Sequence, residues 1–464
     1  MKSVIERELI DNIKNFRFVL LFIFSTLLFF LNGMIYPEKY HNDLTYYSSY
    51  NNKFFGTPSL NYRVIPKPGP LSFIAEGGDK HRPREYWLRP SCSIRPIQHK
   101  RHDNEIPNIP EPDWAFIIKI IFSLYVILMG YNAISGEKEQ GTLRLVLSNP
   151  FSRIKLIVIK YCAIMITVSV PLLAGIIVNL IIINLLQPDV FAAATVSSLL
   201  IMLVTTFAYL SVFALLSLMF SSIIHQSSLV LLALMVIWIG FNITPDLTGI
   251  ISSRFAPVVS EMDIAGKYND FDFTENYESF RQRVNQGEFS TEEELRNASK
   301  QFYIALQKNF NDQINDYRNS INQRIKLARN LSRISPTALF QYISESIAGT
   351  GFKREKNFLD DVTKYSIIYD TFLTEKFGEL PAKFDFGGFG FTVDFNCKKV
   401  RISSPSSRGI KRGFDDTDVP VFQESKPSFT RTLHDALLDL SGLLLWNIVL
   451  ALGAFIAFFR ADVR

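Results

Sequence analysis

The chain has 464 residues, of which 48% are hydrophobic and only 20% are charged, and 40 of them are phenylalanine. A water-soluble protein of this size would carry about a quarter charged residues, so the composition indicates membrane-embedded segments and excludes a disordered or collagen-like chain. The net charge of +5 is small, and no run of Lys and Arg alternates with aromatic residues, so we expect no nucleic acid as a partner.

Residues 1–15 have an apolar side and a charged side, which favours an amphipathic elbow helix at the membrane surface. Six apolar stretches follow, each reaching the roughly 20 residues that a helix needs to cross the hydrocarbon core. A cleaved signal peptide is the alternative for the first stretch, but its apolar run is long and no small-residue cleavage site follows. The sequence predicts an all-α polytopic membrane protein with six transmembrane helices over residues 16–36, 114–133, 157–186, 191–220, 229–251 and 437–459.

Some residues of these stretches are unusual for a lipid-facing helix. Lys119 lies near one end of the second stretch, from where its ammonium can reach the headgroups. Pro171 lies within the third stretch, where we expect a tilt or a kink. Asn179 and Asn184 of the same stretch could line a path, but hydrogen bonding between helices is the more ordinary role.

Basic residues near the ends of the stretches predict the orientation of the chain. Lys and Arg gather before the first stretch, in the connection 134–156 and in the tail 460–464. The positive-inside rule places these three segments, and therefore both termini, in the cytoplasm. We expect a multi-pass protein of a bacterial cytoplasmic (inner) membrane, in contact with lipid.

Two long polar insertions, residues 37–113 and 252–436, then lie on the exoplasmic side. The first is rich in Pro, Tyr and Asn, which favours irregular or short-stranded structure over helix. In the second, Ser290 and Glu293 have the spacing of a capping box before a long amphipathic helix that reaches Arg329. The second insertion is expected to be mainly helical, with further helices from Pro336 to Gly349 and over residues 357–377, a strand pair over 384–395 and a loop over 401–418.

The connection between the second and third stretches holds the most informative motif, GEKEQGTLRLVLSNPFSRIKLIVIK, which begins at residue 136. On its chemistry alone it could be a charged amphipathic turn held by lipid headgroups. It also resembles the signature of ABC-2 type transporter permeases, in which an acidic-Gly-Thr-Leu pattern precedes a Pro and basic residues that enter the next span. The residues of this chain that match the signature are Glu137, Glu139, Gly141, Thr142, Leu143 and Arg144.

The resemblance implies that residues 134–156 form a cytoplasmic coupling helix that docks on a separate ABC ATPase. Glu137 or Glu139 would then pair with Arg or Lys of the ATPase, while Leu143 and Leu145 would fill its groove. The membrane part would work as two permease subunits, either two copies or homologues. Residues 327–351 are similar to permeases with a large exoplasmic domain before the last span, near those of nitrous-oxide reductase maturation and gliding motility.

No P-loop motif occurs in the chain, so ATP and Mg would bind to the partner ATPase and this chain would need no cofactor of its own. His99 and His102 have a spacing that could suit a metal, but two basic residues separate them and we expect a solvated loop. Cys92 and Cys397 fall in the two exoplasmic insertions, where an oxidising compartment would permit a disulfide; unpaired thiols are the alternative. We find no arrangement typical of a catalytic centre.

The sequence therefore predicts the permease subunit of an ATP-driven ABC-2 transporter, with export as the expected direction and an unidentified substrate. A membrane-anchored scaffold, whose exoplasmic domain recruits envelope proteins without transport, is the first alternative. A membrane-embedded enzyme is the second, and the absence of His, Asp or Glu clusters within the spans argues against it. An exoplasmic protein partner is compatible with both the transporter and the scaffold.

Overall fold

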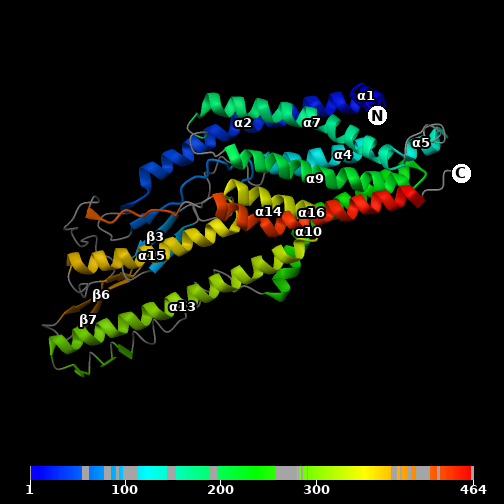
Figure 1. The fold of residues 1–464 in the computed structure, drawn as a ribbon. Helices are drawn as coiled ribbons and strands as arrows, with labels where there is room; N and C mark the ends of the chain where they lie inside the picture. Colours follow the sequence, from blue (N-terminus) through cyan, green and yellow to red (C-terminus); the bar gives the residue numbers. More distant parts are fainter. Residues whose placement is uncertain are drawn as a thin grey trace.

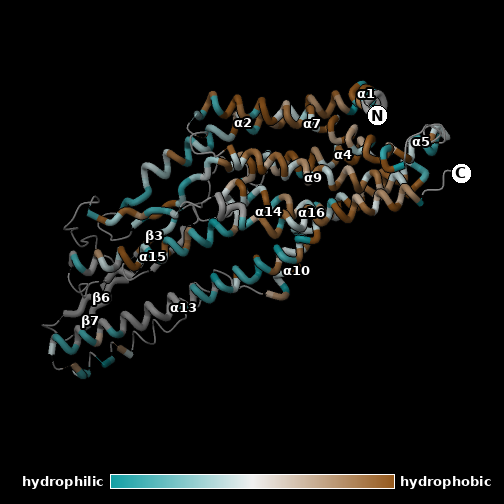
Figure 2. The backbone as a smooth tube through the Cα atoms, in the orientation of Figure 1, coloured by the Kyte–Doolittle hydropathy of each residue, from teal (hydrophilic) through white to brown (hydrophobic). Residues whose placement is uncertain are grey.

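The computed structural model shows an elongated molecule, in which a helical bundle continues at one end into a polar domain (Figure 1). Hydrophobic residues follow the bundle, whereas hydrophilic residues dominate the helices of the polar domain (Figure 2). The structure describes residues 2–54, 62–77, 85–89, 93–97, 112–143, 153–188, 190, 196–256, 279–280, 282–283, 286–289, 291–377, 384–386, 389–394, 399–403, 418–425 and 429–460.

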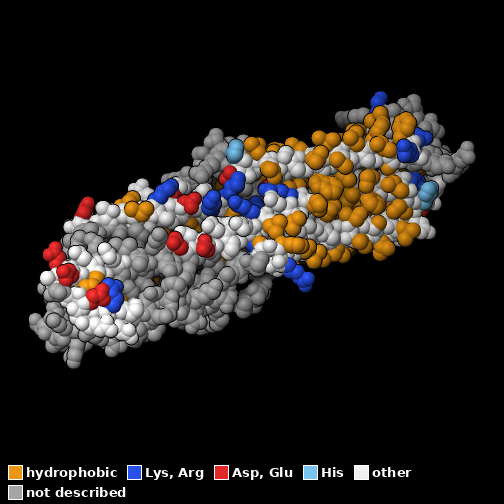
Figure 3. Space-filling view, turned by 90° about the horizontal axis from the view of Figure 1, so that it is seen from below, with side chains coloured by type: hydrophobic (Ala, Val, Ile, Leu, Met, Phe, Trp, Pro, Cys, Tyr) orange, Lys and Arg blue, Asp and Glu red, His pale blue; other side chains and the backbone are white. Residues whose placement is uncertain are grey.

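In this described part of the chain, six helical spans are long and apolar enough to cross a membrane, and each overlaps one of the six predicted stretches. Apolar side chains cover the bundle in a broad belt (Figure 3), as surface that meets lipid requires. The expected all-α polytopic membrane protein is confirmed. The spans are α2 (Phe16–Tyr50), the composite of α3 (Trp114–Phe116), η2 (Ile117–Phe122) and α4 (Ser123–Gly130), α7 (Arg153–Leu186), α9 (Val196–Ile223), α10 (Ser227–Phe255) and α16 (Phe429–Arg460).

The bundle is held together by close contacts of α2 with α7 and of α9 with α16. A Cβ at Gly175 of α7 would lie 2.3 Å from the ring of Phe29 in α2, so glycine is what permits this approach. Asn179, one turn further along α7, donates to the Phe29 carbonyl at 2.7 Å and accepts from Trp114 Nε1 at 2.9 Å. Asn179 therefore bonds between helices, whereas Asn184 is exposed on the outside of α7.

The N-terminal residues form a helix, α1 (Lys2–Ile13), that packs against α7. In Figure 1, α1 lies at the same end of the bundle as the last turn of α16 and the short helix α5 (Ser135–Glu139). Helix α7 begins at Arg153 and continues through Pro171 to Leu186 as one unbroken helix.

Helix α2 does not end where its apolar stretch ends. It continues through Pro37 to Tyr50, so the prediction of irregular or stranded structure is wrong for residues 37–50. Contacts with the polar domain hold this extension: the Tyr36 hydroxyl donates to the Pro70 carbonyl at 2.8 Å, and the Tyr46 hydroxyl donates to Glu85 at 2.9 Å. Tertiary contacts thus override the weak local preference of this segment.

The two polar insertions share one hydrophobic core. Tyr62 of the first insertion stacks on Tyr369 of the second, with ring centroids 5.3 Å apart, and Tyr86 meets Phe358 at the same distance. The short-stranded structure predicted for the first insertion is present as an antiparallel sheet. Its strands, in spatial order, are β1 (Lys53–Phe54), β2 (Tyr62–Val64), β3 (Glu85–Arg89) and β4 (Ser93–Ile97), and they pack with α15 (Phe352–Phe377).

The second insertion contains the long predicted helix, α13 (Glu292–Ser332), but its start differs from the prediction by one residue. The capping box is formed by Thr291 and Glu294, because Thr291 has the extended backbone of an N-cap and its hydroxyl accepts from the Glu294 N–H at 3.2 Å. The predicted strand pair is confirmed within a three-stranded antiparallel sheet, β5 (Phe384–Phe386), β6 (Phe389–Asp394) and β7 (Lys399–Ser403). Strand β7 takes up the start of the predicted loop 401–418, of which residues 404–417 lie outside the described chain.

Helix α14 (Pro336–Ala348) belongs to the bundle although it lies in the second insertion. The ring of its Phe340 stacks on the ring of Tyr209 in α9, with centroids 4.4 Å apart, and both rings are fully buried. Its N-cap, Ser335, donates its hydroxyl to the Phe241 carbonyl of α10 at 2.7 Å. Gly349 ends the helix with a φ of 69°, a backbone conformation that glycine adopts without steric cost. Helix α14 thus joins α9, α10 and α16 at one end of the bundle.

Candidate functional site

The residues predicted to couple to a partner lie on and after a short helix, α5 (Ser135–Glu139), beyond the end of α4. The main-chain N–H groups of Ile134 and Ser135 both donate to Ser221 Oγ of α9, at 2.9 and 2.8 Å. The Ser135 hydroxyl lies 3.0 Å from that of Ser227, the first residue of α10. Helix α5 is therefore fixed between the last turn of α9 and the first turn of α10.

The glycine of the motif has a clear structural role. Gly141 has a φ of 67°, and its N–H donates to the Lys138 carbonyl at 3.1 Å. The next N–H, of Thr142, donates to the Glu137 carbonyl at 3.0 Å. These two bonds form a Schellman motif, which closes the end of a helix on itself and needs a left-handed residue at this position. The spacing of the motif thus produces a self-capped turn.

Glu137 of the motif is bound within the chain. Its Oε1 lies 2.7 Å from Nζ of Lys160 in α7, and the same ammonium lies 3.2 Å from Oε1 of Glu8 in α1. The side chain of Lys160 is only 3% exposed. One buried cation therefore joins α1, α5 and α7.

The next two motif residues tie α5 to its neighbours. Glu139 accepts from both the main-chain N–H and the hydroxyl of Ser227, each at 2.9 Å. A carboxylate at the first turn of a helix also interacts favourably with the helix dipole of α10. On the other side, the Lys138 ammonium donates to the Ser222 carbonyl near the end of α9.

These contacts change some roles expected from the sequence. Leu143 does not offer its side chain to a partner, because it is buried in the core of the bundle with 3% exposure. The carboxylates of Glu137 and Glu139 have partners inside this chain, which the sequence could not reveal. Within the described part of the segment, three consecutive residues are exposed, Glu139 and the two at its tip, Gln140 and Gly141.

Several predicted site residues lie outside the described part of the chain. The end of the motif is among them, as are both cysteines of the predicted disulfide. Cys162 of α7 is described and has a free thiol. The residues left without a structural account are Arg144, Leu145, Pro150, Cys92, Cys397, His99 and His102.

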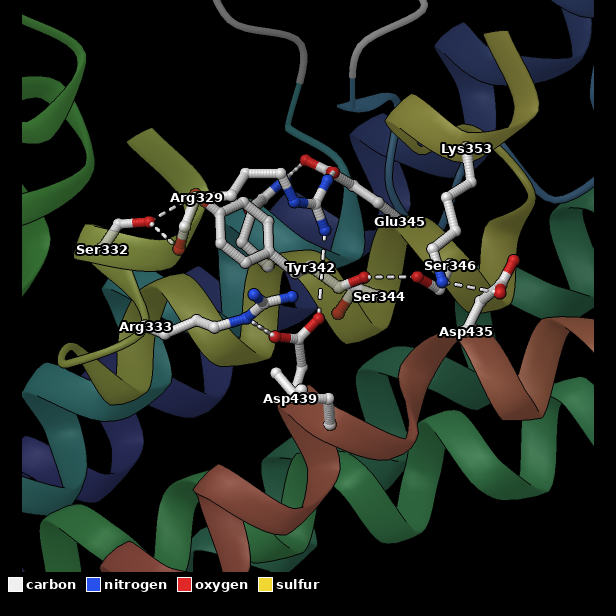
Figure 4. A network of polar contacts seen from close by, with 12 residues as sticks. Arg329, Ser332, Arg333, Tyr342, Ser344, Glu345, Ser346, Lys353, Asp435 and Asp439 are labelled. Atoms are coloured by element: carbon white, nitrogen blue, oxygen red, sulfur yellow. Dashed lines mark hydrogen bonds and ion pairs between the residues drawn. The ribbon is translucent and has the colours of Figure 1, made fainter. Parts of the chain in front are cut away.

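A second group of ionisable residues lies at the opposite end of the bundle, where α13, α14 and α16 meet (Figure 4). Asp439 of α16 is 1% exposed and lies 2.6 Å from Nε of Arg333 and 3.9 Å from Arg329. The Arg329 guanidinium also lies over the ring of Tyr342, at 3.9 Å, and 3.7 Å from Glu345. Arg329 of α13 and Arg333, the C-cap of that helix, thus meet carboxylates of α14 and α16.

This network extends to the second span. Gln341 donates to Glu345 at 3.0 Å and accepts from the Lys119 ammonium at 3.4 Å. Lys119 therefore points towards α14, where Gln341 gives its ammonium a polar partner within the chain. Burial raises the pKa of the Glu345 carboxyl, and the nearby Arg329 opposes this shift only in part. Asp439 was missed, but the sequence carries a signal for it, because ionisable residues within apolar spans are rare and usually have partners.

The helix around Lys119 has a local irregularity. Residues Ile117–Phe122 form a π-helical turn, η2, and the Lys119 carbonyl accepts from the Tyr209 hydroxyl at 3.0 Å and from the Ser123 hydroxyl at 2.5 Å. Such turns occur frequently at functional sites. Within the described residues, no group of three or more His, Cys, Asp or Glu side chains could hold a metal ion.

The fold and these two sites define a multi-pass membrane protein with a rigid, self-capped helix between its second and third spans. The family described as "ABC-2 family transporter protein" matches residues 2–463, and the chain belongs to this family. It is therefore the permease component of an ABC transporter, a class of membrane subunit that associates with an ABC ATPase. No curated protein matches the chain.

Proposed function

We propose that this chain is the permease subunit of an ATP-driven exporter and that α5 with its capping turn is the contact for a separate ATPase. The observation that carries the proposal is the geometry of this segment. Ser221, Ser227 and Lys160 anchor its base in the bundle, while the tip at Gln140 and Gly141 is exposed. A rigid projection of this kind can pass a push or a pull to the spans without deforming.

The sidedness follows from charge. Helix α1, α5 and the end of α16 lie at one end of the bundle (Figure 1), and this end carries the basic residues that the positive-inside rule places in the cytoplasm. The polar domain would then lie on the exoplasmic side of a bacterial inner membrane, where it could bind a further protein. ATP and Mg would be bound by the ATPase.

A second permease subunit, either a copy of this chain or a homologue, would complete the path by which the substrate crosses the membrane. Helix α10 supports this part of the proposal, because only 11% of its apolar window is buried within the single chain. In the working cycle, closure of the ATPases on ATP would displace α5, and α4, α9 and α10 would move with it because they are bonded to or continuous with that segment.

The test is co-purification of the tagged chain in detergent, with identification of the retained proteins and an ATPase assay. Gln140→Arg places a charge on the exposed tip without removing an intramolecular contact that holds α5. Val421→Arg, on an exposed residue of the polar domain, is the matched control. We expect the original chain and the control to retain a P-loop ATPase and Gln140→Arg to lose it. If the original chain retains no ATPase, the transporter proposal fails and the scaffold alternative becomes the better one.

A further inference from the structure

Lys160 occupies an unusual position at the end of the bundle that carries α5. It lies near the beginning of the span α7, yet its side chain is almost completely buried. Its ammonium is shared by two carboxylates that belong to two other elements, Glu137 of α5 and Glu8 of α1. Glu8 is about one-third exposed, at 33%, and Glu137 is less so, at 20%.

Stability alone is a weak explanation for this arrangement. Removing an ammonium from water is costly, and replacing a buried ion pair with apolar side chains of similar volume is often neutral or stabilising. The surroundings of Lys160 in α7 are apolar: its neighbours Leu156, Ile157 and Ala163 are all buried. Apolar side chains at positions 8, 137 and 160 together would therefore serve packing at least as well.

The contact geometry offers a different explanation. The distance from the ammonium is 2.7 Å to Glu137 and 3.2 Å to Glu8, so the cation lies closer to the carboxylate of α5 than to that of α1 in this conformation. The second oxygen of Glu137 is buried and has no hydrogen-bond partner in the described chain. A displacement of α5 would lengthen the Glu137 contact, and Glu8 is in position to keep the ammonium paired while that happens.

Helix α1 and α7 are also joined by a second polar contact one to two turns deeper, where Asn12 Nδ2 donates to Thr167 Oγ1 at 3.4 Å. This contact keeps α1 on α7 independently of Lys160. Helix α1 can therefore stay on α7 while the Glu8 carboxylate moves closer to the Lys160 ammonium or further from it.

We infer that Lys160 is a positioning residue that couples α5 to α1 and α7, by exchanging its ammonium between Glu137 and Glu8 as the ATPase cycle moves α5. This inference rests on the proposed function. It assigns to the elbow helix an ionic part in transmission, in addition to its packing on the third span.

The test compares Lys160→Met with Lys14→Met, which removes the same charge from an exposed residue at the same end of the molecule. Each variant is purified with the ATPase that the original chain retains. Two reporter cysteines, Ile10→Cys on α1 and Ile334→Cys before α14, are exposed by 50% and 72% and are introduced separately into a chain whose three native cysteines are replaced by alanine. The readout is the rate of maleimide labelling with and without ATP and vanadate.

With the original chain and with Lys14→Met, we expect nucleotide to change the labelling rate at both positions. With Lys160→Met, the ATPase should still be retained, and the nucleotide-dependent change should fall by roughly tenfold, as the loss of a coupling between sites predicts. Lys160→Arg should restore the change, and so should the double exchange Lys160→Glu with Glu137→Lys. A purely structural role would not produce rescue by an exchange of charges.

The outcomes separate the two proposals. If Lys160→Met retains the ATPase and responds to nucleotide like the original chain, the inference about Lys160 is overturned while the proposed function stands. If neither reporter of the original chain responds although an ATPase is retained, the inference is also overturned. If Lys160→Met does not fold, the response of Lys160→Arg and of the double exchange decides, since both keep a cation and a carboxylate at the site.

Discussion

Glu139 holds the first turn of α10 in place, because its two carboxylate oxygens accept from the main-chain N–H and the hydroxyl of Ser227, each at 2.9 Å. A residue that the sequence suggested as a contact for another protein is thus a tether between two parts of this one. The stability of the isolated permease should depend on it.

Glu139→Gln should lower the free energy of unfolding by about 1 kcal/mol, since a neutral amide loses the charge-assisted bonds to Ser227. Thermal unfolding of the purified chain in detergent measures the effect. Glu38→Gln, on an exposed carboxylate of α2, is the control and should leave Tm unchanged. An unchanged Tm for Glu139→Gln together with loss of the ATPase would mean that Glu139 faces the partner instead.

Asp439→Asn should be much more damaging than Asp435→Asn, four residues earlier on the same helix. Asp439 is buried and pairs with Arg333 and Arg329, so its loss leaves partly buried guanidinium groups without a counter-charge and should cost about 3 kcal/mol. The partner of Asp435, Lys353, is 59% exposed, and such pairs contribute less than about 1 kcal/mol. Equal losses of stability would contradict the assignment of the network.

The buried carboxyl of Glu345 should produce a pH dependence. Burial raises its pKa above the ordinary 4.5, and although Arg329, Gln341 and Lys119 oppose this shift, Asp113 adds to it. The folded state therefore holds this proton more tightly than the unfolded state, so the stabilisation is present below pH 4.5 and is lost as the pH rises through the raised pKa.

Measured as Tm against pH, the original chain should lose stability relative to Glu345→Gln as the pH is raised from 4.5, because the glutamine stays neutral throughout. Parallel curves for the two proteins would show that the Glu345 carboxyl keeps its ordinary pKa. Glu38→Gln again serves as the control, since Glu38 is exposed.

Gly175→Ala should destabilise the contact of α2 with α7, because the added methyl would lie 2.3 Å from a carbon of the buried Phe29 ring. Overpacking of this kind costs about 2 kcal/mol. Gly240→Ala is the matched change in α10, where no atom lies within 4 Å, and it should leave Tm unchanged or raise it slightly. Thermal unfolding of the two variants side by side distinguishes steric conflict from a general effect of losing a glycine.

The six spans could be predicted because a membrane requires about 20 consecutive apolar residues, a signal that is local in sequence. The extension of α2 could not, because residues 37–50 begin with a proline and carry no apolar periodicity. Contacts of Tyr46 within the extension, and of Tyr36 just before it, with Glu85 and Pro70 hold this part of the helix. The position of α14 in the bundle could not be predicted from the sequence either. Its apolar face is visible in the sequence, but whether that face meets the polar domain or Tyr209 depends on tertiary packing.

For the candidate site, the motif singled out the segment between the second and third spans, but it did not indicate the contacts that its side chains make within the chain. Gly141 has a local explanation, the Schellman turn, and this could be predicted from spacing. The partners of Glu137 and Glu139 are Lys160 and Ser227, which are distant in sequence, and no local pattern pairs them. The resemblance to a family predicts that one of these carboxylates pairs with an ATPase; in this structure each has a partner within the chain.

The shared core of the polar domain has a consequence for the synthesis of the protein. Tyr62 and Tyr86 leave the ribosome early, but their partners Phe358, Tyr369 and Phe422 are made only after the second to fifth spans. The first part of the domain must therefore wait, with its aromatic side chains uncovered, until most of the chain has been inserted. A chain truncated before residue 422 would leave part of this aromatic core exposed permanently. Exposed hydrophobic side chains of this kind are what quality-control proteases can recognise.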